Sequence, residues 1–256
     1  MQDLSPTARF SNRVEDYVRY RPDYPPALLH WLHREMGVAA DARVADIGAG
    51  TGISTKMFLD AGHPVTAVEP NAAMRAAAER WLGGDAGFRA VDGRAEATTL
   101  ADASVDLVSA AQAFHWFDQQ AVKAEWARIL RPGGLAAIYW NSRRLTGSAF
   151  LEGYEQLLLE HGLDYSSVSE RYGDDAMMER WFGEGLRGKA RFDHGQRLDF
   201  DALRGRLLSS SYAPPAGHPG HAPMLEALRA LFDATARDGL VDFDYDTRVF
   251  AGTLSA

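Results

Sequence analysis

The sequence contains no cysteine among its 256 residues, and this absence excludes several chemistries at once. Disulfide scaffolds, zinc ribbons, iron–sulfur clusters and thiol nucleophiles all need that residue. Long hydrophobic runs are also missing, since no apolar stretch approaches the roughly 20 residues of a membrane-spanning helix. The start, Met1 to Pro6, lacks the basic and then apolar pattern of a signal peptide. We therefore expect a cytoplasmic protein that has no membrane partner.

Positive charge is scarce, with 27 Lys and Arg residues against 35 Asp and Glu residues and a formal net charge of −8. Such a balance disfavours binding to a phosphate backbone, so we expect no nucleic-acid partner. A hydrophobic fraction of 46% is ordinary for a globular protein and argues against disorder. Because no internal repeat or low-complexity linker divides the chain, we expect one domain, present as a monomer or a homodimer.

Short apolar segments alternate with helical segments through residues 41–140. Short connections between such segments are typical of a parallel sheet with right-handed crossovers. The expected strands cover residues 43–48, 64–68, 88–91, 105–111 and 135–140, and the expected helices cover residues 54–61, 72–82 and 119–130. We expect residues 131–134 to form a turn before the fifth strand.

The second half of the chain follows a different pattern. Helices are predicted over residues 149–161, 200–208 and 224–237, strands over 191–200 and 241–250, and irregular segments over 164–188 and 209–223. Because no crossover helix follows the last strand, these two strands predict an antiparallel hairpin. The expected fold class is α/β: a Rossmann-like, doubly wound, mostly parallel seven-stranded sheet with an antiparallel C-terminal hairpin and a helical cap.

The sharpest motif is the glycine loop Gly48-Ala49-Gly50-Thr51-Gly52, which follows the first predicted strand. Alternate glycines let the backbone pass close to a ligand before a helix begins. A dinucleotide-binding loop would need glycine or alanine where Ile53 stands, and a phosphate-binding loop would need lysine there. Asp46 instead lies two residues before the first glycine, at the end of the strand.

Glu69 ends the second predicted strand. A carboxylate at that place can accept hydrogen bonds from both hydroxyls of a ribose, and it disfavours a 2′-phosphate. Alone, Glu69 could equally be a solvated charge at the end of a strand. Together with the glycine loop at this spacing, it indicates a ribose-containing cofactor other than NADP.

Four motifs follow one another over roughly residues 40–140: Asp46-x-Gly48-x-Gly50-x-Gly52, Glu69-Pro70-Asn71-x-x-Met74, Asp92-Gly93-Arg94-Ala95-Glu96 and Leu130-Arg131-Pro132-Gly133-Gly134. This ordered set resembles the class I S-adenosylmethionine-dependent methyltransferases. More narrowly, the segments Arg9 to Val14, Tyr20 to Pro25 and Ala113 to Phe117 resemble methyltransferases of type 11 and trans-aconitate methyltransferase-like proteins. The resemblance implies S-adenosyl-L-methionine as the cofactor and S-adenosyl-L-homocysteine as its product.

The resemblance also implies roles for the matching residues. The glycine loop would pass beside the methionine and the ribose, and Asp46 would orient that loop or, through water, the methionine ammonium. Glu69 would hold the ribose hydroxyls, and the residues after Glu69 and within the Asp92 motif would flank the adenine. Helix packing is the alternative explanation for Met74. The candidate cofactor-binding residues are Asp46, Gly48, Ala49, Gly50, Glu69, Pro70, Asn71, Met74, Gly93, Arg94, Ala95 and Gln112.

The methyl acceptor should lie outside the carboxyl ends of the strands, where open α/β sheets bind ligands. Aromatic side chains follow the fourth strand, and His115 among them could act as a general base. Arg143, after the fifth strand, could clamp a carboxylate. Core packing of the aromatic residues and solvation of the arginine are the alternatives. The candidate catalytic residue is His115, and the candidate acceptor-binding residues are Tyr20, Arg21, His115, Trp116, Trp140, Asn141 and Arg143.

These observations predict an S-adenosylmethionine-dependent methyltransferase that acts on a small-molecule acceptor, with O-methylation of a carboxylate or hydroxyl by in-line displacement. The alternatives are a Rossmann-type NAD-dependent oxidoreductase and an S-adenosylmethionine-binding protein that catalyses a non-methylating step. No metal is expected, because the pair His218 and His221 has no nearby third ligand. The single domain would comprise an N-terminal helical lid (1–40), a cofactor-binding core (41–140), a cap insertion (141–190) and a part that completes the sheet (191–256).

Overall fold

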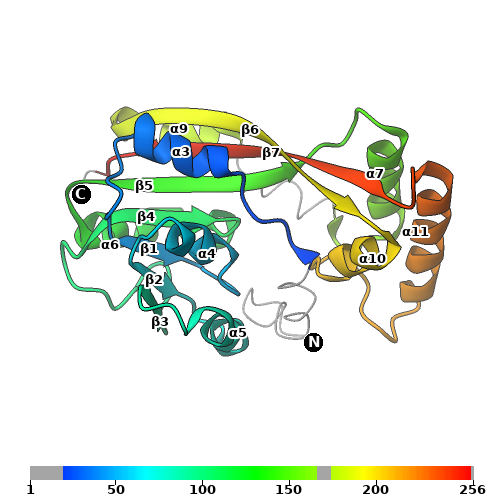
Figure 1. Ribbon diagram of the computed structural model, residues 1–256, viewed down its shortest axis with the longest axis horizontal. Helices are drawn as coiled ribbons and strands as arrows, with labels where there is room; N and C mark the ends of the chain where they lie inside the picture. Colours follow the sequence, from blue (N-terminus) through cyan, green and yellow to red (C-terminus); the bar gives the residue numbers. More distant parts are fainter. Residues whose placement is uncertain (1–19, 166–173, 255–256) are drawn as a thin grey trace.

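Seven strands form one sheet in the order β3-β2-β1-β4-β5-β7-β6 in the computed structural model, which describes residues 20–165 and 174–254 (Figure 1). The parallel strands are β1 (Val44–Ile47), β2 (Val65–Val68), β3 (Phe88–Val91), β4 (Val105–Ala111) and β5 (Leu130–Arg143). The remaining strands, β6 (Leu186–Leu198) and β7 (Val241–Gly252), pair antiparallel with each other, and β7 pairs antiparallel with β5. The predicted doubly wound, mostly parallel sheet with an antiparallel C-terminal hairpin is confirmed.

The central strand of the parallel part is β1, which lies between β2 and β4. Its first residue, Val44, is paired with Val65 of β2 and with Leu107 of β4, and the whole of β1 is buried. The chain moves outward from β1 to β3 on one side and then crosses to β4 on the other. Such a switch in direction leaves a crevice at the carboxyl ends of the two central strands, and ligands of α/β proteins bind there.

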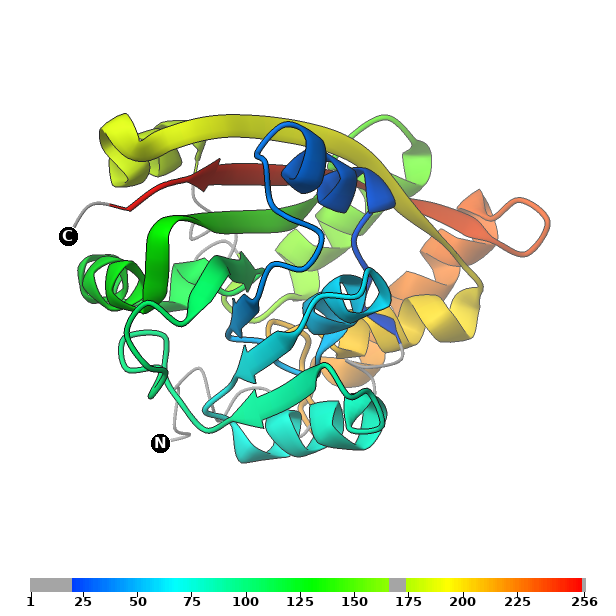
Figure 2. The same ribbon diagram turned by 60° about the vertical axis from the view of Figure 1, so that its left-hand side comes forward.

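Helices cover both faces of the parallel strands (Figures 1 and 2). On one face, α3 (Pro26–Arg34) and α4 (Ile53–Asp60) bury Leu32 and Phe58 against β1, β2 and β4. On the other face, α6 (Gln119–Ile129) and α9 (Asp175–Phe182) bury Trp126 and Met178. Helix α5 (Ala72–Leu82) begins after Asn71, whose side chain accepts hydrogen bonds from the first-turn N–H groups, as an N-cap residue does.

The predicted turn at residues 131–134 lies inside β5. Leu130 already pairs with Val105 of β4, and the register then shifts before the regular pairing resumes at Leu135. Gly133 has a φ of +81°, a conformation in which glycine lets a strand bulge without ending it. The fifth strand was predicted to start at residue 135 after a turn. This prediction is wrong, because the pairing of Leu130 extends β5 to include residues 130–134.

Part of the predicted irregular segment 164–188 is regular. Helix α9 begins after Asp174, whose carboxylate accepts a hydrogen bond from the Met177 N–H at 2.6 Å. Strand β6 starts at Leu186 and not at residue 191, because the long strand β7 offers partners from there onward. The intervening residues 166–173 lie outside the described part of the chain.

A helical cap stands at the carboxyl-end side of the parallel strands (Figure 1). It consists of α7 (Ala149–His161), α10 (Phe200–Leu208) and α11 (His221–Thr235), which pack with the start of β7 in a core of their own. Helix α9, although within residues 141–190, packs on the sheet instead. The β6–β7 hairpin carries α10 and α11 to the cap because it extends past the parallel strands. Among the described helices, none is both long and apolar enough to span a membrane.

Candidate cofactor site

The glycine loop follows β1 and passes close over neighbouring side chains. Gly48, Gly50 and Gly52 have φ values of +68°, +58° and +94°, which only glycine adopts readily. A Cβ atom added at Gly48 would lie 2.8 Å from the Cβ atom of Ala113 and 3.0 Å from Cζ of Phe117. At Gly50 the nearest atom would be Sδ of Met74, at 3.9 Å. The loop is held in place by its own backbone, since the Gly48 N–H donates a hydrogen bond to the Val68 carbonyl at 2.9 Å, at the switch point of the sheet.

Glu69 connects the end of β2 to this loop. Its Oε2 accepts a hydrogen bond from the Gly50 N–H at 2.9 Å, and its Oε1 accepts one from the Asn71 N–H at 2.8 Å. Burial raises the pKa of Glu69, and these two N–H groups oppose the rise. Each carboxylate oxygen has a further lone pair. Glu69 can thus position the loop and still accept hydrogen bonds from a ligand's hydroxyls.

Asp46 lies beneath the loop and is fully buried. Its two carboxylate oxygens accept hydrogen bonds from Ser54 Oγ at 3.1 Å and from Thr55 Oγ1 at 2.7 Å, both in the first turn of α4. Burial raises the pKa of Asp46 to about 6, although these hydroxyls lower it. Asp46 does not line the pocket above it. Of the two roles expected for Asp46, this geometry favours orientation of the loop over a contact with the methionine ammonium.

A hydroxyl network extends this support across the sheet. The Tyr139 hydroxyl lies 2.7 Å from Ser54 Oγ and 2.8 Å from Ser109 Oγ, and all three side chains are buried. Neither these three residues nor Thr55 was predicted to belong to the site. The sequence does contain a signal for this network: Ser54 and Thr55 directly follow the glycine loop, and a hydroxyl in the first turn of a helix can bond to a nearby acid.

A small pocket of about 40 Å³ opens at the loop. It brings together several predicted residues from distant parts of the chain. Gln112 has a φ of +56° and donates a hydrogen bond from Nε2 to the Asn141 carbonyl at 2.9 Å. Asn141 Nδ2 donates in turn to the Asp23 carbonyl at 2.8 Å. The pocket is lined by Arg21, Pro22, Tyr24, Gly48, Ala49, Gly50, Ile53, Ser54, Ala111, Gln112 and Asn141.

The residues predicted to flank the adenine lie around the end of β2. Asn71 caps α5 by accepting hydrogen bonds from its first turn, and Met74 is buried in that helix. A Cβ atom at Gly93 would lie 2.8 Å from the Thr98 carbonyl, so this position needs glycine for packing. The other members of this group are Pro70, which is exposed, Arg94, whose side chain is 78% exposed, and Ala95, which is buried.

On the acceptor side, the structure places two predicted residues away from the pocket. Trp140 is fully buried between Phe114 and Phe250, because alternate residues of β5 point to opposite faces and its neighbour Tyr139 faces the loop. Arg143 forms an ion pair with Glu155 of α7 and does not line the pocket. We therefore correct both expectations: Trp140 belongs to the core, and Arg143 binds the cap.

Of the remaining acceptor-side predictions, Arg21 and Asn141 line the pocket, and His115, Trp116 and Tyr20 do not. His115 and Trp116 are half-buried in the short helix η1 (Phe114–Trp116), with their ring centroids 4.8 Å apart. Arg21 Nη2 donates a hydrogen bond to the Ser209 carbonyl at 3.0 Å. Tyr20 packs on α10, since a Cβ atom at Gly205 would lie 2.1 Å from its ring. Of the predicted N-terminal lid, residues 1–19, including the segment Arg9 to Val14, lie outside the described residues.

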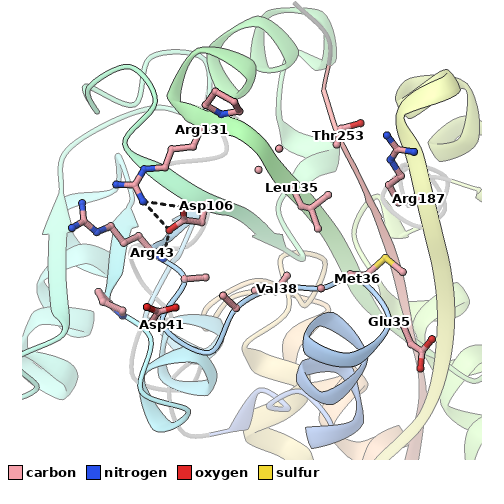
Figure 3. Close-up of a pocket in the computed structure, with 17 residues that line it drawn as sticks. Glu35, Met36, Val38, Asp41, Arg43, Asp106, Arg131, Leu135, Arg187 and Thr253 are labelled. Carbon is pink, nitrogen blue, oxygen red and sulfur yellow. Dashed lines mark hydrogen bonds and ion pairs between the residues drawn. The ribbon is translucent and has the colours of Figure 1, made fainter.

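A much larger hollow lies elsewhere, at the amino ends of the parallel strands (Figure 3). It measures about 1090 Å³. Asp106 accepts hydrogen bonds there from the Arg43 N–H at 2.8 Å and from Arg131 Nη1 at 2.9 Å. Burial raises the pKa of Asp106, but these bonds outweigh burial and leave the pKa lowered. None of the glycine-loop residues lines this hollow, so size alone does not locate the cofactor site. Among the described residues no three histidine or acidic side chains are grouped as a metal site requires.

Comparison with known proteins agrees with the site's geometry. A family described as a methyltransferase domain matches residues 45–138. An uncharacterized methyltransferase of Mycobacterium tuberculosis is 42% identical over 138 residues, which cover 52% of this chain and 52% of that protein. A malonyl-acyl-carrier-protein O-methyltransferase of Enterobacter lignolyticus is 42% identical over 98 residues, 38% of each chain. The chain thus spans about half the length of the curated relatives it matches.

Solved structures extend the similarity to nearly the whole chain. A candidate type II methyltransferase from Anaeromyxobacter dehalogenans has a TM-score of 0.65 at 25% identity, covering 91% of this chain and 98% of that chain. A methyltransferase structure from Anabaena variabilis, with a TM-score of 0.61 at 20% identity, covers 92% of this chain and 99% of that chain and supports the fold. The fold, the glycine loop and these similarities define a class I methyltransferase domain in this chain. Its cofactor is S-adenosylmethionine, the methyl donor of that class.

Proposed function

We propose that this chain transfers a methyl group from S-adenosylmethionine to an oxygen atom of a small molecule. The observation that carries the proposal is the Glu69 carboxylate bound to the Gly50 N–H at the switch point of the sheet. That arrangement presents a hydrogen-bond acceptor for ribose hydroxyls beside a loop whose backbone a ligand can approach closely. The acceptor would lie beside the pocket at this loop, which Arg21, Gln112 and Asn141 help to line.

Each part of the site has a role in this proposal. Gly48, Ala49 and Gly50 lie beside the methionine and ribose, and Glu69 holds the ribose hydroxyls. Gln112 and Asn141 form the wall between cofactor and acceptor, fixed by their mutual hydrogen bond. The adenine lies among Pro70, Asn71, Met74, Gly93, Arg94 and Ala95.

The protein's contribution to the reaction is alignment and exclusion of water. S-adenosylmethionine supplies a methyl group that is already activated by its sulfonium. Holding two reactants in line can contribute roughly 7–11 kcal/mol to lowering the barrier. A carboxylate acceptor needs no base, and His115 would then only donate a hydrogen bond. A hydroxyl acceptor must lose its proton, and His115, half-buried after β4, is the candidate base.

The choice of oxygen as the methylated atom rests on one relative. The matching protein of Enterobacter lignolyticus is named for O-methylation of malonyl-acyl-carrier protein. The narrower resemblance seen in the sequence also implies a carboxylate acceptor. Methylation of a nitrogen or carbon atom is therefore the result that would contradict the proposal.

Calorimetry with S-adenosylmethionine, S-adenosylhomocysteine and NAD tests the cofactor, and we expect the first two to bind and NAD not to bind. Binding of NAD alone would support the oxidoreductase alternative. A methyl-transfer assay over carboxylates, phenols and amines, with products identified by mass spectrometry, tests the reaction. Transfer to an amine, or cofactor binding with no methylated product from any acceptor, would contradict O-methylation.

A further inference from the structure

A buried polar cluster lies inside the cap, and we call its members, Tyr154, Arg206, Ser210 and Tyr245, the cap cluster. Arg206 lies in α10 and is 6% exposed. Its Nε donates a hydrogen bond to the Tyr245 hydroxyl at 3.1 Å, and its Nη1 donates one to Ser210 Oγ at 3.1 Å. The guanidinium also lies 5.4 Å from the ring centroid of Phe243. All of these partners are neutral.

The charge of Arg206 is not balanced by an acid. Within residues 20–165 and 174–254, none of its hydrogen bonds or ion pairs involves a carboxylate. Burial alone would lower the pKa of Arg206, but the Tyr245 hydroxyl that accepts its hydrogen bond opposes this, and a guanidinium stays protonated in proteins, so the group is cationic. Burial raises the pKa of Tyr245, so that hydroxyl is neutral. A buried guanidinium without a counter-charge is unfavourable, and such groups are normally paired.

A second group in the cluster, the Tyr154 hydroxyl, lacks a hydrogen bond within the described part of the chain. The Tyr154 side chain is fully buried, and its hydroxyl has no hydrogen-bond partner among the described residues. Tyr154 lies near Arg206, since both pack on Phe243: the Tyr154 and Phe243 ring centroids are 5.0 Å apart, and the guanidinium is 5.4 Å from the Phe243 ring. Native proteins rarely leave a buried hydroxyl without a partner. The cap cluster therefore offers one cation and one hydroxyl donor, and an anionic oxygen would complement both.

The cluster is connected to the cofactor pocket through the start of the described chain (Figures 1 and 2). Arg21 lines the pocket and donates its hydrogen bond to the carbonyl of Ser209, the neighbour of Ser210. Tyr20 packs on Gly205, the neighbour of Arg206. Gln196 links both sides, because its Nε2 donates to the Tyr20 carbonyl at 3.4 Å and its Oε1 accepts from the Tyr245 hydroxyl at 3.1 Å.

We propose that the cap cluster binds a carboxylate of the methyl acceptor, with Arg206 and the Tyr154 hydroxyl as donors. The acceptor is accordingly a small acid that reaches from the cofactor pocket into the cap. Guanidinium–carboxylate hydrogen bonds are charge-assisted and directional, so this contact selects acids over neutral molecules of the same shape. The inference rests on the proposed function, and it makes Arg206 a specificity-determining residue.

Binding of acids to the protein loaded with S-adenosylhomocysteine tests this. Succinate, glutarate and adipate are each compared with their dimethyl esters by calorimetry. We expect at least one acid to bind at least about tenfold more tightly than its ester, since the ester lacks the charge. In Arg206→Gln that preference should disappear while the affinity for S-adenosylhomocysteine is retained, and Arg206→Lys should restore part of it. The matched control is Arg204→Gln on the same helix, because Arg204 is exposed and only pairs with Asp201; it should bind like the wild type.

Tyr154→Phe keeps the ring and removes only the hydroxyl, so it serves if Arg206→Gln does not fold. It should weaken acid binding several-fold without loss of cofactor affinity. The carboxylate assignment would be overturned if acid and ester bound equally, or if wild type and Tyr154→Phe bound the acid equally. It would also be overturned if the affinity for inorganic phosphate changed in these variants as the affinity for the acid does. Failure to bind S-adenosylhomocysteine would instead contradict the proposed function, and the two results are therefore distinguishable.

Discussion

The Glu69 carboxylate accepts a hydrogen bond from the Gly50 N–H at 2.9 Å, so an acid from β2 holds the glycine loop that follows β1. The same carboxylate binds the Asn71 N–H, at the N-cap of α5. Two strands and one helix thus meet at one side chain. Because this side chain is buried, its loss should affect both the loop and any ligand that shares its lone pairs.

Replacing Glu69 by Gln should weaken the binding of S-adenosylhomocysteine by at least about tenfold. An amide can offer only one oxygen, and hydrogen bonds to a charged group are worth about 1.5–3 kcal/mol. Calorimetry on the folded variant measures the effect. Glu79→Gln, at an exposed position of α5, is the matched control and should leave the affinity unchanged. Equal affinities in both variants would contradict the role assigned to Glu69.

The buried carboxyl of Asp46 should make stability depend on pH. Its pKa is about 6 in the folded protein, above the roughly 3.9 of an unfolded chain. The folded state therefore binds this proton more tightly, and stability is lost as pH rises from about 4 to about 6. Over that range we expect the free energy of unfolding of wild type to fall, relative to Asp46→Asn, by about 1–3 kcal/mol. Urea unfolding at several pH values measures it, and parallel curves for the two proteins would refute it.

Gly48 should tolerate alanine less well than Gly37, although the two have similar φ values of +68° and +73°. Both substitutions incur the left-handed backbone strain of about 1–2 kcal/mol. Only at Gly48 would the new Cβ atom also press on Ala113, whereas at Gly37 nothing lies within 4 Å. Overpacking adds about 1–3 kcal/mol. Denaturant unfolding should show the difference, and Gly48→Ala alone should lower cofactor affinity. Equal destabilisation of Gly48→Ala and Gly37→Ala would show that the glycine loop rearranges to accommodate the added Cβ atom.

His33 and His63 join α3 to the segment before β2, with their Nε2 atoms 2.8 Å apart. His63 Nδ1 lies 3.0 Å from the Ala42 carbonyl and must donate to it, so the neutral His63 accepts at Nε2 and His33 donates. Burial, His63 and His30 lower the pKa of His33. The folded state thus binds this proton less tightly, and stability is lost as pH falls through about 6.5.

His33→Gln should accordingly reduce the loss of stability between about pH 7.5 and 5.5, by roughly half a kcal/mol after solvent screening. Thermal unfolding across that range measures the slope. His218→Gln, at an exposed loop position, is the control and should keep the wild-type slope. A wild-type slope in His33→Gln would indicate that the histidine pair does not titrate as argued.

Local patterns in the sequence were enough for much of the fold and for the centre of the site. The alternation of short buried strands with capped helices set the parallel sheet, because each segment's period and end signals are local properties. The glycine spacing and the acid after β2 located the loop and Glu69 for the same reason. Gln112 and Asn141 were also expected at the site, and both line the pocket.

Other features depended on contacts between distant segments. The pair Arg143–Glu155, the burial of Trp140 and the hydroxyl network at Tyr139 each join residues that no local pattern connects. Which face of β5 meets the loop is decided by register with β4 and β7, and a shift of one residue would exchange Tyr139 and Trp140.

The class of cofactor site can be read from local sequence, since strand, glycine loop and acid follow each other closely along one chain. The residues that face this site from the cap depend on tertiary packing. The long β6–β7 pair carries α10 to the carboxyl-end side of the sheet, where Arg206 contacts Tyr245 and Phe243. The partners of Arg206 come from separate elements, and only their packing shows that none of them within residues 20–165 and 174–254 is a carboxylate.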